Sequence, residues 1–152
     1  MTAEGCYTGL CTYLETLLTM VWYPTTVATL SRRIRDSIEA AFERSVDGGA
    51  AHPALPSRVH DFGCRGCTCV EQAVIGGSAH LLSFEGTDTL PAAYYTAAAR
   101  NGGAPTARSI PATEHSAMMA SRSEREAFER AIQRYGSGTL SVLVRLRDAR
   151  FA

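Results

Sequence analysis

The sequence predicts an α/β fold in which parallel βα units form a sheet and two helices precede it. The chain has 152 residues with 45% hydrophobic and 20% charged content, which is typical of one globular domain. After a central loop, short runs of branched and aromatic residues alternate with helical segments of about ten residues. Strands that are connected by helices pair in parallel, because the crossover returns the chain to the same edge of the sheet.

Two helices are predicted before the sheet. Apolar side chains at helical spacing indicate a first helix over residues 10–23, which Pro24 is expected to end. A second apolar stripe indicates a helix over residues 32–45, with Ser31 as its N-cap. Glycine and proline punctuate residues 47–57, which are therefore expected to form a connecting loop.

The βα pattern begins after this loop. The predicted strands cover residues 58–62, 80–84, 107–110 and 140–146. The predicted helices between them cover residues 70–78, 90–100 and 124–135. Ser123 and Glu126 have the spacing of a capping box at the start of the last helix.

Chemically capable side chains follow the predicted strands. Arg65 follows the first strand, Asp88 the second, and Glu114 and His115 the third. Ligand sites of parallel α/β proteins lie at this carboxyl edge, so we expect a site there. By residue type alone, Phe62 would be a core residue, and the arginine, aspartate and histidine would be surface, cap or loop residues.

Charge and cysteine content restrict the class of protein. Lys plus Arg and Asp plus Glu are each 15, so no net charge favours nucleic acid or membrane surfaces. Polar residues and Pro24 interrupt the apolar stretch of residues 10–27, which predicts neither a signal peptide nor a membrane span. An odd number of cysteines, five, favours a reduced, cytoplasmic protein.

Three of the cysteines are closely spaced. Cys64, Cys67 and Cys69 have a spacing that occurs in zinc and redox sites. A fourth zinc ligand is not obvious, since His60 and Cys11 are both conceivable, and we predict no metal site here.

Three segments resemble motifs of the nicotinamide phosphoribosyltransferase family. They are His-Asp-Phe-Gly-Cys-Arg-Gly at residues 60–66, Gly-Thr-Asp-Thr at residues 86–89 and Pro-Ala-Thr-Glu-His-Ser at residues 111–116. Their order and spacing are those of the family, and the similarity covers about residues 4–142. The Glu-His-Ser version is more similar to the nicotinamide branch than to the nicotinate branch.

The resemblance implies a pentosyltransferase of NAD salvage that transfers phosphoribosyl from phosphoribosyl pyrophosphate to nicotinamide, giving nicotinamide mononucleotide and pyrophosphate. By matching motif positions, Phe62 would stack on the pyridine ring, Asp88 would accept a hydrogen bond from the carboxamide, and Arg65 would bind phosphate. His115 is similar to the family's histidine that ATP phosphorylates, while His60 and Glu114 would support their neighbours. The resemblance further implies Mg²⁺ on the pyrophosphate, ATP as a coupled substrate, and a homodimer.

The resemblance also implies an irregular TIM-type barrel, of which this chain would form an incomplete part. A full barrel takes about 250 residues and eight strands, whereas four strands are predicted here. The expected organisation is a helical lead-in and loop over residues 1–57, a partial barrel over residues 58–146 and a divergent tail over residues 147–152. Asp148 lies where the family has an Asp-rich turn. A fragment, a splice variant or a frameshifted gene would each fit this ending, and an inactive remnant that binds nicotinamide or a full-length subunit is the alternative function.

Overall fold

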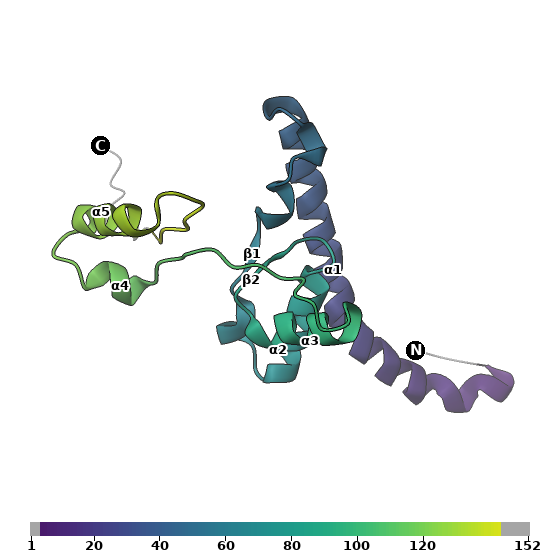
Figure 1. The fold of residues 1–152 in the computed structure, drawn as a ribbon. Helices are drawn as coiled ribbons and strands as arrows, with labels where there is room; N and C mark the ends of the chain where they lie inside the picture. The colour runs from purple at the N-terminus through teal and green to yellow at the C-terminus, as the bar shows by residue number, and fades with distance from the viewer. Residues whose placement is uncertain (1–3, 144–152) are drawn as a thin grey trace, which may run out of the picture. The chain divides into compact units, whose positions relative to one another are not determined.

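The computed structural model describes residues 4–143, which belong to two compact units. The first unit is Met1–Ser109 and the second is Ile110–Ala152. The first contains one long helix, two shorter helices and a small parallel sheet, and the second contains two helices (Figure 1). This mixture of helices with parallel strand pairing confirms the α/β class.

One helix, α1 (Cys11–Ser45), replaces the two that the sequence predicts. A short 3-10 segment, η1 (Gly5–Leu10), precedes it, and Pro24 lies inside it. The prediction that Pro24 ends a helix was wrong, and so was the N-cap assignment of Ser31, which is buried in the middle of α1. A proline inside a helix costs roughly 3 kcal/mol. Packing of α1 against the next helix on both sides of the proline offsets this cost.

The helix α2 (Val70–His80) packs closely both on α1 and on α3 (Leu90–Arg100) (Figure 1). A Cβ atom at Gly77 would come within 2.5 Å of the Ala92 Cβ, and one at Gly76 within 2.5 Å of the Tyr23 hydroxyl oxygen. Both glycines therefore permit a close approach that a larger residue would block. The prediction of residues 90–100 as a helix is confirmed, and α2 extends two residues beyond the predicted end.

The sheet consists of β1 (His60–Asp61) and β2 (Gly86–Thr87), which pair in parallel. Arg108 adds a parallel bridge to Gly86, where the predicted third strand lies. The predicted strand at residues 80–84 was wrong. These residues finish α2 and form a turn, in which the N–H groups of Ser83 and Phe84 bond to the His80 carbonyl oxygen.

The segment between α1 and β1 contains two single-turn 3-10 helices, η2 (Gly49–Ala51) and η3 (Leu55–Ser57). Gly48 has a φ of 92°, a left-handed conformation that favours glycine. Leu55 is fully buried. This turn-rich segment therefore also contributes an anchor to the core of the first unit.

The second unit contains α4 (His115–Met119) and α5 (Glu124–Tyr135), as well as a parallel bridge between Ala112 and Ser141. The bounds of α5 are those predicted. The Ser123 hydroxyl accepts a hydrogen bond from the Glu126 N–H at 3.2 Å, which confirms the N-cap. The Glu126 carboxylate accepts from the Arg122 N–H at 3.1 Å rather than from Ser123, so the capping box is modified. The predicted fourth strand extends beyond the described residues.

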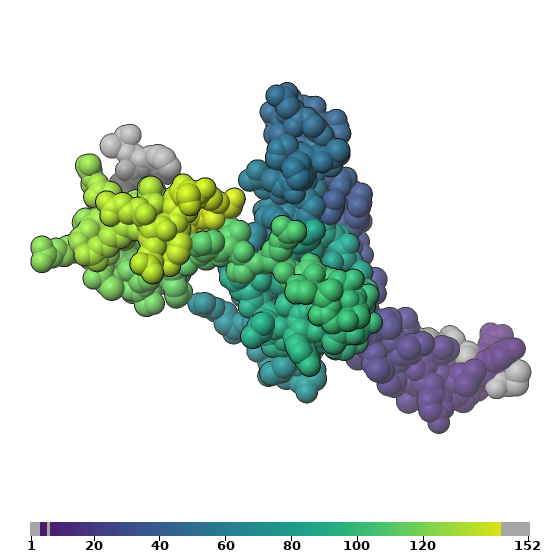
Figure 2. Space-filling view, viewed as in Figure 1, coloured from purple at the N-terminus to yellow at the C-terminus, as the bar shows by residue number. Residues whose placement is uncertain are grey.

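The N-terminal half of α1 exposes many large apolar side chains, and its turns project from the body of the first unit (Figure 2). They are Tyr13, Leu14, Leu17, Leu18, Met20, Val21 and Trp22. Neither this helix nor any other in residues 4–143 has the run of apolar residues that a membrane crossing requires. An exposed apolar patch of this kind marks an interaction surface.

Candidate functional site

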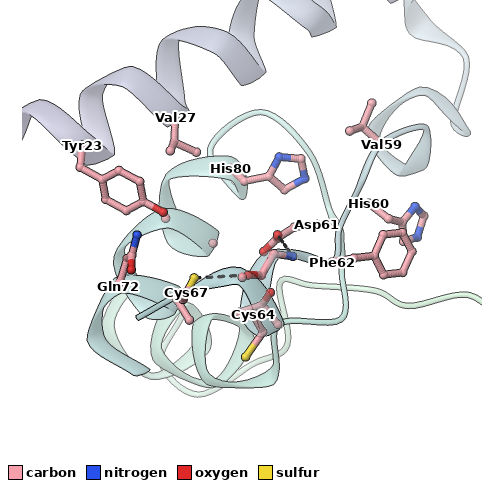
Figure 3. A pocket seen from close by; sticks show the side chains of 16 residues that line it. Tyr23, Val27, Val59, His60, Asp61, Phe62, Cys64, Cys67, Gln72 and His80 are labelled. Carbon is pink, nitrogen blue, oxygen red and sulfur yellow. Dashed lines mark hydrogen bonds between the residues drawn. The ribbon is translucent and has the colours of Figure 1, made fainter. Parts of the chain in front are cut away.

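Phe62 and Asp88 lie beside each other in the fold, because they directly follow the paired strands β1 and β2. The Asp88 N–H donates to the Asp61 carbonyl oxygen at 2.9 Å, which extends the strand pairing by one step. The Phe62 side chain is 49% exposed, and its ring stacks on His60 at 6.1 Å between centroids with 22° between planes (Figure 3). Half of the Phe62 surface is therefore available to a flat ligand.

The Asp88 side chain is exposed, and Ser109 contacts it from the segment that follows the third strand position. The Ser109 hydroxyl donates to Asp88 Oδ1. Three segments far apart in the sequence thus meet at one edge of the sheet, as the topology of parallel strands requires. The contribution of Ser109 was not predicted, because the sequence does not show that its hydroxyl faces Asp88.

A carboxylate that the sequence analysis missed holds the first two motifs together. Asp61 Oδ1 accepts the Gly63 N–H at 2.7 Å, and Asp61 Oδ2 accepts the Thr87 hydroxyl at 3.3 Å. Thr87 Oγ1 in turn accepts the Thr89 N–H at 3.0 Å. These bonds fix the backbone on both sides of Phe62 and Asp88. The Asp-x-Gly pattern, which is typical of a side-chain-to-backbone turn, was the signal that could have identified Asp61.

His80 connects α1 to β2. Its Nδ1 lies 3.1 Å from the Ser31 hydroxyl oxygen, its Nε2 lies 3.1 Å from the Gly86 carbonyl oxygen, and its ring stacks on Phe84 at 5.2 Å. A carbonyl oxygen only accepts, so we assign the proton to Nε2, and Nδ1 accepts from Ser31. Because His80 is buried, it fixes the strand that precedes Asp88. Sequence reasoning placed His80 in a strand and missed this role.

A pocket of about 410 Å³ lies between α1, α2 and the turn that follows β1 (Figure 3). Its walls combine apolar, hydroxyl, amide and imidazole groups. They include Tyr23, Val27, Asp61, Phe62, Gln72 and His80. The pocket therefore adjoins the strand ends and offers both aromatic surface and hydrogen-bonding groups to a small polar ring.

The other predicted site residues lie in two places. Arg65 is exposed in η4 (Gly63–Gly66), the 3-10 turn that begins directly after Phe62. Glu114 is the N-cap of α4 in the second unit, and His115 is the first residue of that helix. His115 Nδ1 lies 3.9 Å from Glu114 Oε1, and the histidine side chain is 58% exposed. The structure thus brings Arg65 next to Phe62 and pairs His115 with Glu114.

The segment between β1 and α2 also contains three free cysteines, Cys64, Cys67 and Cys69. The Cys67 thiol lies 3.3 Å from the Gly63 carbonyl oxygen, to which it donates. Desolvation raises the pKa of this thiol, and the neighbouring thiols and Asp61 raise it further. Within residues 4–143, no group of three or more His, Cys, Asp or Glu side chains is placed to hold a metal ion.

Comparison with known proteins identifies the family. Residues 57–145 match the model of the nicotinate phosphoribosyltransferase (NAPRTase) family. The chain is 44% identical over 120 residues to a nicotinamide phosphoribosyltransferase of Xanthomonas campestris, covering 75% of this chain and 24% of that protein. For the proteins of the same name from Acinetobacter baylyi and Mycoplasma genitalium, the identities are 33% over 135 residues and 30% over 141 residues.

The alignment with the Acinetobacter baylyi protein covers 86% of this chain and 26% of that protein. The alignment with the Mycoplasma genitalium protein covers 91% of this chain and 28% of that protein. The chain thus spans about a quarter of the length of the curated relatives that it matches. The resemblance to proteins named nicotinamide phosphoribosyltransferase is confirmed. The family match extends over both strands, α2, α3 and all three motifs, and includes more than half of the chain. The chain therefore belongs to the nicotinate phosphoribosyltransferase family.

Proposed function

We propose that the protein is a nicotinamide phosphoribosyltransferase. In this reaction the pyridine nitrogen of nicotinamide displaces pyrophosphate from phosphoribosyl pyrophosphate, and nicotinamide mononucleotide forms for NAD synthesis. The observation that carries the proposal is the placement of an exposed aromatic ring, Phe62, and a carboxylate, Asp88, at adjoining ends of parallel strands. Three relatives that match most of this chain and are named for the same activity support it.

Phe62 and Asp88 would recognise the base. The exposed part of the Phe62 ring stacks on the pyridine ring, since its contact with His60 already fixes its orientation. The Asp88 carboxylate accepts a hydrogen bond from the carboxamide NH₂ of nicotinamide. Nicotinate carries a carboxylate at the same position, so repulsion between the two negative charges favours nicotinamide.

Arg65 would bind phosphate oxygens of the donor and the product. Its guanidinium presents paired N–H donors whose geometry matches phosphate. The backbone of its turn is held by the bond from Gly63 to Asp61, so Arg65 is placed relative to the base site. Mg²⁺ would enter bound to the pyrophosphate oxygens of the donor and would neutralise part of their charge.

His115 would couple ATP hydrolysis to the reaction. Its imidazole Nε2 attacks the γ-phosphorus of ATP, the bond to the β-phosphate oxygen breaks, and ADP leaves. The Glu114 carboxylate lies 3.9 Å from His115 Nδ1, the ring nitrogen that does not attack, and would orient the imidazole for the transfer. Exposure of the His115 side chain gives the nucleotide access.

In the complete enzyme, the parallel βα units would form part of an irregular TIM-type barrel, and two copies would form a homodimer in the cytoplasm. Strands of only two residues need further strands beside them for stability. The apolar surface on the first half of α1 supports burial against further protein. Free cysteines support a reducing compartment.

The proposal is tested by offering the purified protein nicotinamide or nicotinate together with phosphoribosyl pyrophosphate, Mg²⁺ and ATP. Chromatography then measures each mononucleotide. We expect nicotinamide mononucleotide to predominate and Asp88→Ala to abolish its formation. Asp36→Ala, which removes an exposed aspartate of α1, is the matched control and should leave the rate unchanged. A preference for nicotinate, or full activity of Asp88→Ala, would contradict the proposal.

A further inference from the structure

The turn that carries Arg65 places two cysteines one 3-10 turn apart. Cys64 lies inside η4 and Cys67 is its C-cap, and the Cys67 N–H donates to the Cys64 carbonyl oxygen at 3.2 Å. Both thiols are free. We propose that Cys64 and Cys67 form a modification site, at which a low-molecular-weight disulfide such as oxidised glutathione converts them into a reversible intramolecular disulfide.

The backbone already has the separation that this bond requires. In a turn closed by a hydrogen bond from residue i+3 to residue i, the first and last Cα atoms lie within about 7 Å. Disulfide-bonded cysteines have Cα atoms about 4.4–6.8 Å apart. The Cα separation that this turn imposes on Cys64 and Cys67 therefore overlaps the range found in disulfides.

Exposure assigns the order of the two thiols. Cys64 is exposed, whereas Cys67 is only partly exposed and its thiol donates to the Gly63 carbonyl oxygen. Figure 3 shows both side chains on the turn after Asp61. Cys64 is therefore accessible to an oxidant first. The raised pKa of Cys67 lowers the thiolate fraction of this residue, which agrees with Cys64 reacting first.

The chemistry is two successive thiol–disulfide exchanges. The Cys64 thiolate attacks one sulfur of oxidised glutathione, the glutathione S–S bond breaks, and one glutathione thiolate leaves. Cys67 loses its proton to solvent and attacks the Cys64 sulfur of the mixed disulfide, which releases the second glutathione. Two protein thiols are oxidised, and one glutathione disulfide is reduced to two thiols.

The bond would enclose Arg65 and Gly66 in a small ring that begins two residues after Phe62. Oxidation would thus restrain the turn that carries the proposed phosphate ligand. This consequence for substrate binding rests on the proposed function. The covalent modification does not, because it follows from the turn and from the accessibility of Cys64 alone.

Trypsin provides a direct assay, because it cleaves after Arg65, between the two cysteines. The purified chain is oxidised with glutathione disulfide under native conditions, free thiols are blocked with N-ethylmaleimide, and the digest is analysed by mass spectrometry without reduction. We expect the peptide of residues 59–65 to remain linked to the peptide of residues 66–100, and a reductant to separate them.

Cys69→Ser is the matched control. It removes the third cysteine, which lies beyond the turn at the N-cap of α2, and should leave the link intact. In Cys67→Ser the link should form at least tenfold more slowly. Loss of the link in Cys69→Ser, or equal rates of linking in Cys67→Ser and the wild-type chain, would overturn the proposal.

Discussion

The buried contact between Ser31 and His80 gives a prediction with a definite sign. Ser31→Ala removes the hydroxyl that donates to His80 Nδ1 and leaves this nitrogen buried without that partner. An unpaired buried polar atom costs about 1–3 kcal/mol. Alanine regains up to about 0.5 kcal/mol through its higher helix propensity. The expected net loss is about 1–2 kcal/mol in the free energy of unfolding.

Ser37→Ala is the matched control, because Ser37 lies on the same helix but is exposed and bonds only to the Arg33 carbonyl oxygen of its own helix. Here only the helix propensity changes, and the stability should rise by a few tenths of a kcal/mol. Urea denaturation followed by far-ultraviolet circular dichroism measures both variants. Equal stability of Ser31→Ala and Ser37→Ala would refute the assignment of His80 as a link between α1 and β2.

A double-mutant cycle sharpens this test. If Ser31 and His80 stabilise the fold through one shared hydrogen bond, the variant Ser31→Ala/His80→Phe should be less destabilised than the sum of the two single variants predicts. Strict additivity would mean that the two side chains act independently, and would contradict the geometry.

Three further predictions concern the same unit. Asp61→Ala should cost about 1–2 kcal/mol in urea denaturation, because the buried Thr87 hydroxyl loses its acceptor. Gly77→Ala should lower the free energy of unfolding by about 1 kcal/mol in the same assay, because the new Cβ would overlap the Ala92 Cβ. Overpacking costs about 1–3 kcal/mol, which exceeds what alanine gains over glycine in helix propensity. Alkylation of Cys67 by iodoacetamide, followed by peptide mapping, should be slow at neutral pH and accelerate as the pH rises through its raised pKa; denaturant should shift this profile to lower pH.

The helices of the βα region were predictable because local signals define their ends. Residues 90–100 begin with a proline in the first turn, and residues 124–135 begin at the Ser123 cap, and both helices have the predicted bounds. The strands were less predictable, because a pairing of two residues leaves little alternating pattern. Residues 80–84 are apolar enough for a strand, but His80 ends α2 and the following residues form a turn.

The continuity of α1 through Pro24 depends on tertiary packing. Tyr23 lies against Gly76, and Ser31 contacts His80, so α2 supports α1 on both sides of the proline. Local propensity contains no information on such contacts, which is why the sequence predicted two helices.

The positions of three candidate site residues at strand ends could be predicted from the sequence, whereas their roles stay predictions. Phe62, Arg65 and Asp88 follow strand ends and lie in motifs of the family. The roles of Asp61 and His80 depend on partners far away in the sequence, namely Thr87 and Ser31. A pattern of residue types does not specify which distant hydroxyl meets which carboxylate or imidazole, so these roles required the structure.

Binding of nicotinamide to the purified chain, followed through amide chemical shifts by nuclear magnetic resonance, tests whether the base binds at the ends of β1 and β2. We expect shifts that cluster at residues 61–65 and 87–89, and much weaker binding of nicotinate. Phe62→Ala should abolish these shifts, whereas Tyr94→Ala, which removes an exposed aromatic ring of α3, should retain them. Shifts that lie elsewhere, or that survive in Phe62→Ala, would contradict the placement of the base site at the ends of β1 and β2.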